Sequence, residues 1–356
     1  MRCNKCFIVK GNTMDMLQRL WLKMWDRLTG LKLMGPIGVV IGLYLLVSLV
    51  LGIWWSQEPD PFEVQPVFIQ TTEGVEKPVI GSATVSTLIA ITDTLLQKPG
   101  GYLSNDRTPP GVWLDNIPNW EFGVLVQARD MSRAMRKDFS RSQSQSTEDV
   151  DLKEAEPLLH FDNNSWLIPS SEGEYKKSLK FLRAYEARLI DPQQQDAQFY
   201  ARADNLRGWL ADVSTRLGSL SQRLSASVGQ KRVNTDLAGE ESARQSTNNA
   251  AELEVKTGWF EIDDVFYEAR GTAWALIHLL QAVEVDFADA LEKKNALISL
   301  RQIVRELEAT QGTVWSPMIM NGNEFGLLAN HSLVMASYIS RANAAIIDLR
   351  TLLEQG

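Results

Sequence analysis

The hydrophobic pattern of this chain begins with one long apolar run. Leu33–Trp55 contains no charged residue, and the next charge is at Glu58. As a helix, 23 residues extend about 34 Å, which is enough to cross a hydrocarbon core of about 30 Å. Trp54 and Trp55 end the run, and tryptophan favours the boundary between lipid and water. The pattern predicts one membrane-spanning helix over 33–56.

The residues after the span are rich in proline. Prolines at positions 59, 61, 66 and 78 interrupt any helix, so we expect an extended juxtamembrane tether over 57–81. Four apolar residues of this stretch are candidates for a short edge strand: Phe62, Val64, Phe68 and Ile69.

Beyond the tether, apolar residues recur every three or four positions, which is typical of amphipathic helices. We expect helices over 82–96, 121–140, 150–159, 171–189, 192–224, 262–285, 287–309 and 328–353. No convincing run of alternating residues predicts a sheet. The fold class is therefore all-α: one N-terminal transmembrane helix followed by a large extracytoplasmic helical bundle with long loops over 82–356.

Local signals predict the helix starts and the connections. Ser82 stands where an N-cap is expected, Ser171-x-x-Glu174 matches a capping box, and Asp191 precedes a proline at a first helical position. Ser140–Asp149 predicts a solvated linker or a fixed polar turn. Gly229–Lys256 predicts a surface loop or the tip of a helix pair.

The strongest periodic signal belongs to the helix expected after Asp191. Its apolar residues recur at alternating steps of four and three: Phe199, Ala203, Leu206, Leu210, Val213, Leu217, Leu220 and Leu224. A repeat of 3.5 residues is typical of a helix packed in a bundle or a coiled coil. We favour a bundle core within one chain over a seam between chains.

Charge predicts the orientation of the span. Seven basic and two acidic residues precede it, whereas the first charges after it are acidic. This asymmetry places the N-terminus in the cytoplasm and the body on the other side. The run is too long for a cleaved signal peptide, so we expect an uncleaved signal anchor. Residues 1–32 form a basic cytoplasmic segment, in which Met14–Leu28 fits either an amphipathic helix on the inner leaflet or a short stub that supplies charge.

The overall charge and the cysteines exclude several classes of function. The formal net charge is −8, and the part after the span carries −13, which disfavours nucleic acid as a partner. Both cysteines, Cys3 and Cys6, precede the span, so the body cannot form disulfides. A single CxxC pair does not complete a zinc site, and we expect no metal and no cofactor.

Two kinds of partner follow from the span itself. The lipid bilayer is the first, through Leu33–Trp55. A homodimer is the second, because small residues at Gly38, Gly42, Ser48 and Gly52 allow two helices to approach closely. Such pairs also arise by chance in apolar runs.

Catalytic signatures are scarce. The chain has no Walker A loop, no GxSxG, no HExxH and no dinucleotide fingerprint after a strand. Of the three histidines, His278 and His331 fall within helical stretches and fit a buried structural role better than a ligand role. His160 stands alone in a loop. We therefore name no catalytic residue.

Two clusters remain as candidate ligand sites. The loop from Gly100 to Glu121 places aromatic rings beside carboxylates, which suits a sugar ring, although anchoring tryptophans and turn-forming acids explain it better. Its candidates are Trp113, Asp115 and Trp120, with Asp106 and Glu121 as the other possible acids. The second cluster is polar and fits either ion pairs between helices or an anion or glycan pocket. Its candidates are Arg129, Asp130, Arg133, Arg141, Arg202 and Asp204.

Several runs of this chain carry a resemblance: KPGGYLSND (98–106), PPGVWLDN (109–116), NWEFGVLVQARD (119–130), FSRSQSQSTED (139–149) and FYARADNL (199–206). They are similar to a bacterial family known only as domain of unknown function 2333, from the anchor to near the C-terminus. The resemblance implies a single-anchor protein of the bacterial inner membrane with its body in the periplasm. It implies no activity and no catalytic residue.

These observations favour a non-enzymatic envelope protein that acts by binding, scaffolding or assembly through its exported helical domain. The expected partner is a protein or the cell wall. The alternatives are a glycan-acting enzyme of the cell wall, or a glycan- or anion-binding sensor, that uses the loop from Gly100 to Glu121.

Overall fold

A computed structural model describes residues 36–70, 76–142, 147–193, 196–233, 252–316, 318–323 and 327–355. The chain divides into two compact units, Met1–Ile53 and Trp54–Gly356. Helix α2 (Pro36–Trp55), of which all but the last two residues belong to the first unit, begins three residues after the predicted start of the span. Among the described helices, α2 alone is long and apolar enough to cross a membrane, with a mean hydropathy of 2.2 over Gly38–Trp55. The amphipathic helix expected at Met14–Leu28 lies outside the described residues.

The second unit is built of helices, which confirms the predicted all-α class. The helices are α3 (Ser82–Gln97), α4 (Asn116–Ala134), α5 (Val150–Leu159), α6 (Ser171–Ile190), α7 (Ala203–Ser225), α8 (Ile262–Asp286), α9 (Ala288–Lys293), α10 (Leu297–Glu308) and α11 (His331–Glu354). A π-helical turn, Met135–Phe139, continues α4. The described part also contains two antiparallel strand pairs: β1 (Phe68–Gln70) with β2 (Glu76–Pro78), and β3 (Gln230–Val233) with β4 (Glu252–Val255).

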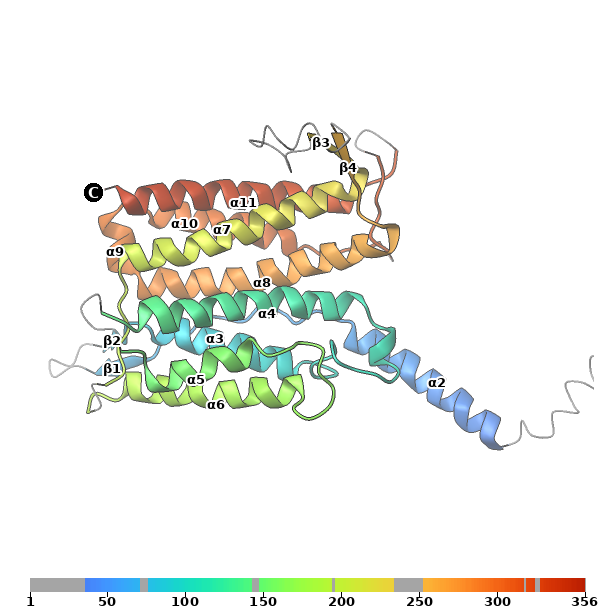
Figure 1. The fold of residues 1–356 in the computed structure, drawn as a ribbon, viewed down its shortest axis with the longest axis horizontal. Coiled ribbons are helices and arrows are strands. Elements are labelled where there is room, and N and C mark those ends of the chain that lie inside the picture. Colours follow the sequence, from blue (N-terminus) through green and yellow to red (C-terminus); the bar gives the residue numbers. More distant parts are fainter. Residues whose placement is uncertain are drawn as a thin grey trace, which may run out of the picture. The chain divides into compact units, whose positions relative to one another are not determined.

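The long helices of this unit alternate in direction along the chain, so their connections fall at two ends of the bundle (Figure 1). We call one the entry end: it comprises the described residues of the connections 98–115, 160–170, 226–261 and 309–330, and the side chain of Trp55 packs there against Gly100. We call the other the far end: it comprises residues 79–81 and the described residues of the connections 135–149, 191–202 and 287–296.

Helices α4 and α8 form the centre of the bundle, where they pack at very short distance. A Cβ atom on Gly271 would overlap the carbonyl oxygen of Trp120, and one on Gly123 would overlap that of Glu268. The rings of Trp120 and Trp274 meet above this contact with centroids 5.2 Å apart, and both side chains are buried. The two glycines therefore allow the backbones to touch, and the tryptophans fill the space beside them.

The heptad pattern is confirmed as a core within the chain, but the predicted start of its helix is wrong. Leu206 to Leu224 are buried along α7, which packs against α11. The Asp191-Pro192 signal does not open this helix: Asp191 ends α6, and α7 begins only at Ala203. Phe199 precedes the helix and packs on the core from a non-helical segment.

Two expected N-caps shift by one residue. Ser170 rather than Ser171 caps α6, because its Oγ accepts the Gly173 N–H, while Ser171 Oγ donates to the Asp162 carbonyl. Gly81 rather than Ser82 is the N-cap of α3, with a φ of 91° that favours glycine.

A distant carboxylate replaces the local cap of α3. Asp286, at the end of α8, accepts the N–H groups of Gly81 and Thr84 at 2.8 and 2.6 Å. The short-range signal was misleading because a residue 200 positions away satisfies the free N–H groups of this helix.

Other predicted bounds also change. Helix α4 begins at Asn116, five residues before Glu121, because Asp115 caps it there. The helix expected over 287–309 is interrupted by Lys294–Ala296, where Asn295 has a φ of 52°. Gly229–Lys256, expected as a loop or a helix-pair tip, contains the paired strands β3 and β4. The last helix begins at His331, capped by Asn330.

The segment between Trp55 and β1 lies against α8. The Glu58 carboxylate accepts two hydrogen bonds of 2.7 Å from the guanidinium of Arg270. The Phe62 N–H donates to His278 Nε2 at 3.0 Å, and the two rings stack with centroids 4.0 Å apart. Of the apolar residues suggested for an edge strand, Phe68 and Ile69 lie in β1, whereas Phe62 and Val64 lie outside any strand.

Candidate ligand pocket at the entry end

The structure separates the residues of the first predicted cluster. Trp120 is fully buried in the core, and Trp113 is 52% exposed in a 3-10 turn. Asp115 is exposed, and its carboxylate accepts the Asn116 N–H at the start of α4. Glu121 is fully buried, forms an ion pair of 2.7 Å with Lys98 and accepts the N–H groups of Leu103 and Ser104. Burial raises the pKa of Glu121, and the ammonium of Lys98 opposes this shift.

Asp106 lies apart from that pair. Its side chain is packed so closely against Gly111 that a Cβ atom at position 111 would overlap it, and burial raises the pKa of its carboxyl. Asp106 and Glu121 therefore serve the folding of the loop in this structure, and Asp115 is the carboxylate of the cluster that reaches an open surface.

In the second predicted cluster, Arg129, Asp130 and Arg133 hold helices together. Arg129 donates to the carbonyls of Leu159 and Phe161 at 2.7 Å each, at the end of α5. Asp130 is buried and accepts 2.9 and 3.2 Å hydrogen bonds from the guanidinium of Arg216. The ion-pair interpretation fits these contacts.

Arg133 extends the same set. It lies 3.5 Å from the carboxylate of Asp130, 3.9 Å from that of Glu156 and 2.8 Å from His160 Nε2. The histidine expected to stand alone in a loop therefore ends α5 and belongs to this polar set.

Arg141, Arg202 and Asp204 lie elsewhere, at the far end. Arg202 pairs with Asp204 at 3.4 Å and stacks on the ring of Tyr200. Burial is the main cause of the raised pKa of Asp138, which Asp204 also raises and Arg141 lowers. The polar residues that the sequence groups together thus form two sets, one along α4 and one beside Asp138.

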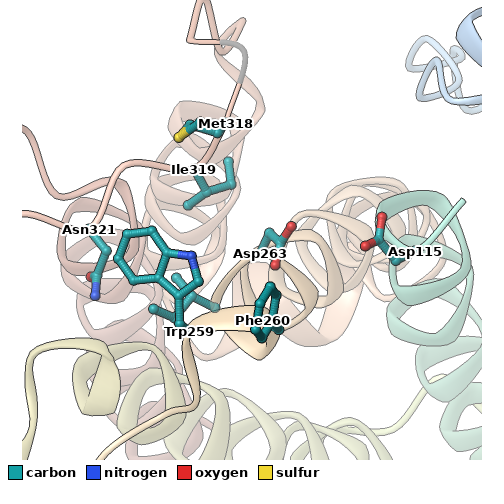
Figure 2. A pocket seen from close by; sticks show the side chains of 8 residues that line it. Asp115, Trp259, Phe260, Asp263, Met318, Ile319 and Asn321 are labelled. Carbon is teal, nitrogen blue, oxygen red and sulfur yellow. The ribbon is translucent and has the colours of Figure 1, made fainter. Parts of the chain in front are cut away.

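The sequence did not indicate a pocket that opens between α4, α8 and the connection before α11. Figure 2 shows Trp259, Phe260 and Asp263 at the start of α8, Asp115 at the start of α4, and Met318, Ile319 and Asn321 on the opposite side. The cavity has a volume of about 230 Å³. Trp259 and Phe260 are 67% and 89% exposed, so their rings are available to a ligand.

Carboxylates dominate the electrostatics beside this pocket. Asp264 accepts a 2.7 Å hydrogen bond from Asn119 Nδ2. Burial, followed by the negative charges of Asp263 and Asp115, raises the pKa of Asp264 to about 6. An acid with this pKa changes its charge near neutral pH. The pocket therefore combines exposed rings with a negative potential that favours a cationic group.

The described residues show no group of three histidine, cysteine, aspartate or glutamate side chains placed to hold a metal ion. Two histidines have structural contacts. His278 is buried between Phe62 and Trp274, as expected. His331 is partly exposed, and its Nδ1 accepts the Met320 N–H at 3.1 Å.

Fold and pocket together define an all-α protein with one candidate membrane helix and an acidic, aromatic pocket at one end of its bundle. The chain belongs to the bacterial family described as "Uncharacterized protein conserved in bacteria (DUF2333)", whose model matches residues 27–356, as the resemblance implied. No curated protein sequence and no solved structure matches the chain.

Proposed function

We propose that this protein is anchored in the bacterial inner membrane by α2, holds its second unit in the periplasm, and acts there by binding a protein partner in the pocket at the entry end. The observation that carries the proposal is the exposed pair Trp259 and Phe260 beside the carboxylates of Asp115 and Asp263. Exposed aromatic rings beside fixed negative charge suit a polypeptide segment that presents both apolar and basic side chains.

Anchoring and orientation rest on the sequence. An uncharged apolar helix follows seven basic residues, and an acidic body follows the helix. A fusion after Gly356 of a phosphatase that works only in the periplasm should be active, and the same fusion with a cytoplasmic reporter should be inactive. The opposite pair of results would contradict the proposed location.

Binding is favoured over catalysis because two of the three acids suggested for glycan chemistry are engaged in holding the loop. Glu121 is paired with Lys98, and the side chain of Asp106 packs against Gly111. A glycan-acting enzyme is the second candidate, since an acid with a pKa of about 6 beside the carboxylates of Asp115 and Asp263 suits general acid catalysis. If it is correct, Asp264→Asn should abolish release of sugars from purified cell wall by the full-length protein.

The binding proposal is tested by crosslinking in intact cells. A photoreactive amino acid replaces Phe260 in one full-length variant and Ile298, at the far end, in another; both native residues are more than three-quarters exposed. Crosslinks to a defined protein should form from position 260 and not from 298. Replacing Asp115 and Asp263 with asparagine should reduce the crosslinks from position 260 several-fold. The control substitution Asp289→Asn, at an exposed residue of the far end, should not reduce them.

Three results would contradict the binding proposal. They are equal crosslinking from positions 260 and 298, no crosslinking from 260, or crosslinks that are insensitive to removal of the two carboxylates.

A further inference from the structure

Large apolar side chains are exposed at the entry end in unusual number. We call them the aromatic rim: Val112, Trp113, Trp166, Leu167, Ile168, Trp259, Phe260, Trp315, Met318, Leu327 and Leu328. Each of the four connections that meet at this end contributes one tryptophan to the rim. Several members are almost entirely exposed, among them Ile168 at 100% and Trp315 at 92%. The rim is thus assembled from segments that are far apart in the sequence.

The tryptophans of the second unit sort by position. Beyond residue 56, Trp120, Trp209 and Trp274 are buried in the core, and the other four belong to the rim. At the far end, the described residues expose isolated apolar side chains such as Ile80, Val150 and Ile298, and no tryptophan. Single exposed apolar residues are normal on a soluble surface, whereas a concentration of them marks a surface that contacts something apolar.

The position of Trp55 indicates what the rim contacts. The candidate membrane span ends at Trp55. The Trp55 ring lies against Gly100 at the entry end, so close that a Cβ atom on residue 100 would be 2.7 Å from the ring. The chain therefore joins the bundle among the loops that carry the rim. Tryptophan side chains gain most at the boundary between headgroups and acyl chains, because the ring is apolar and its N–H stays hydrated.

We propose that the aromatic rim inserts into the outer leaflet of the membrane in which α2 is anchored, so that the bundle rests on the bilayer by its entry end. The inference rests on the proposed anchoring and adds a second, interfacial membrane contact to it. The rim binds by its apolar side chains rather than by charge, since the carboxylates of Asp115 and Asp263 lie beside it. The pocket would then open at the membrane surface, where a partner's segment leaves the bilayer.

The test measures contact between the rim and lipid chains in the full-length protein. Cys3 and Cys6 are replaced by serine, and a single cysteine carrying an environment-sensitive fluorophore is introduced as Ile168→Cys or, as the control, Ile298→Cys. The two isoleucines match in type and are 100% and 77% exposed. Each protein is reconstituted in phosphatidylcholine vesicles with or without lipids that carry a quencher on the acyl chain.

Quenching at position 168 should exceed that at 298 several-fold, and Leu167→Cys, a rim position outside the pocket, should behave like Ile168→Cys. Replacing part of the phosphatidylcholine with an anionic lipid should not increase the quenching. Equal quenching at positions 168 and 298 would overturn the inference. So would low quenching at 168 combined with crosslinks between two copies through that cysteine, because the rim would then be a dimer surface.

The same samples separate this inference from the anchoring proposal. If the protein does not float with the vesicles in a density gradient, the anchoring is wrong. If it floats with them and position 168 is unquenched, the anchoring stands and the rim does not contact lipid. Melting temperatures equal to that of the parent would establish that the labelled variants are folded.

Discussion

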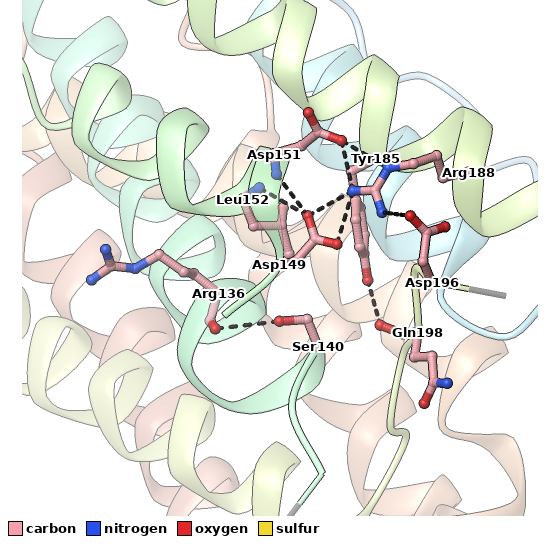
Figure 3. A network of polar contacts seen from close by, with 9 residues as sticks. All are labelled: Arg136, Ser140, Asp149, Asp151, Leu152, Tyr185, Arg188, Asp196 and Gln198. Atoms are coloured by element: carbon pink, nitrogen blue, oxygen red, sulfur yellow. Dashed lines mark hydrogen bonds and ion pairs between the residues drawn. The ribbon is translucent and has the colours of Figure 1, made fainter. Parts of the chain in front are cut away.

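The two ends of the helical bundle differ in whether their aromatic side chains are buried or exposed. At the far end, the rings of Phe139, Phe199 and Phe287 pack on one another with centroids 5.2 to 5.7 Å apart, and Phe139 and Phe287 are fully buried. Figure 3 shows the polar part of this end, where Arg188 binds the carboxylates of Asp149 and Asp151. At the entry end, rings of the same kind point into solvent.

The difference separates side chains that stabilise the fold from side chains that do not. Aromatic and charged groups of the far end find their partners within the chain, so this end stabilises the fold. The entry end exposes apolar groups that have no such role, and exposed groups of this kind add little to the stability of an isolated chain. Function is therefore expected at the entry end, and substitutions should separate the two ends by their effects on stability.

The largest loss of stability should come from a substitution in the contact between α4 and α8. Gly271→Ala would force α4 and α8 apart, because the new methyl group overlaps the Trp120 carbonyl. We expect a loss of about 3 kcal/mol in the free energy of unfolding, near the upper end for overpacking. Thermal unfolding followed by circular dichroism measures it. Gly208→Ala on α7, where a Cβ atom meets nothing within 4 Å, is the control and should be neutral or slightly stabilising.

Acid should weaken the attachment of the Glu58–Phe62 segment through His278. Burial lowers the pKa of His278 to about 4, and its neutral Nε2 accepts the Phe62 N–H. Because the folded-state pKa lies below the unfolded value of about 6.5, the unfolded chain takes up this proton first as the pH falls. The contribution of His278 to the free energy of unfolding is therefore fully present above about pH 6.5. It decreases by about 3 kcal/mol as the pH falls to about 4.

Urea unfolding at several pH values measures the contribution of His278. The variant His278→Asn should be less stable at pH 7 but should lose less stability between pH 6.5 and 4 than the parent. A decrease of the same size in both proteins would show that other groups cause it.

A smaller effect is expected from the far-end network. Arg188→Ala leaves Asp149 and Asp151 without their guanidinium partner, and we expect a loss of about 2 kcal/mol, reduced from the value for a fully buried pair because Asp151 is partly exposed. Arg301→Ala removes a more exposed pair with Glu284 and should cost less than about 1 kcal/mol. Equal losses in the two variants would argue against a special role of the far end.

The smallest change in stability should accompany the largest change in binding. Phe260→Ser at the entry end removes an exposed ring and should alter the free energy of unfolding by less than about 0.5 kcal/mol. The same variant should reduce crosslinking from a photoreactive residue at position 259. A loss of stability similar to that of Arg188→Ala would mean that the ring supports the fold.

Sequence periodicity located most helices because their burial repeats with the helical turn. Val150–Leu159 was predicted with its observed bounds, and the heptad residues from Leu206 to Leu224 are buried as expected. Local capping signals were less dependable. Asp191 resembles an N-cap but ends a helix, and the first N–H groups of α3 are satisfied by Asp286, which no local pattern can indicate.

The pocket was missed for a related reason. Asp115 was named as a candidate, but Trp259, Phe260 and Met318 lie in connections without periodicity, and they meet only because α4 and α8 begin at the same end. The second cluster was predicted as one polar site because its members are all charged residues. The fold instead distributes them between the helix interface around Asp130 and the surroundings of Asp138.

The attachment of Glu58 and Phe62 to α8 has a mechanical consequence. Tension applied to the chain at Trp54 would reach Arg270 and His278 before it reached α3, because these contacts precede Ser82 along the chain. Beyond the contact of Trp55 with Gly100, load would thus enter the bundle through α8 and spread over its many neighbours, rather than peel the structure from its first helix.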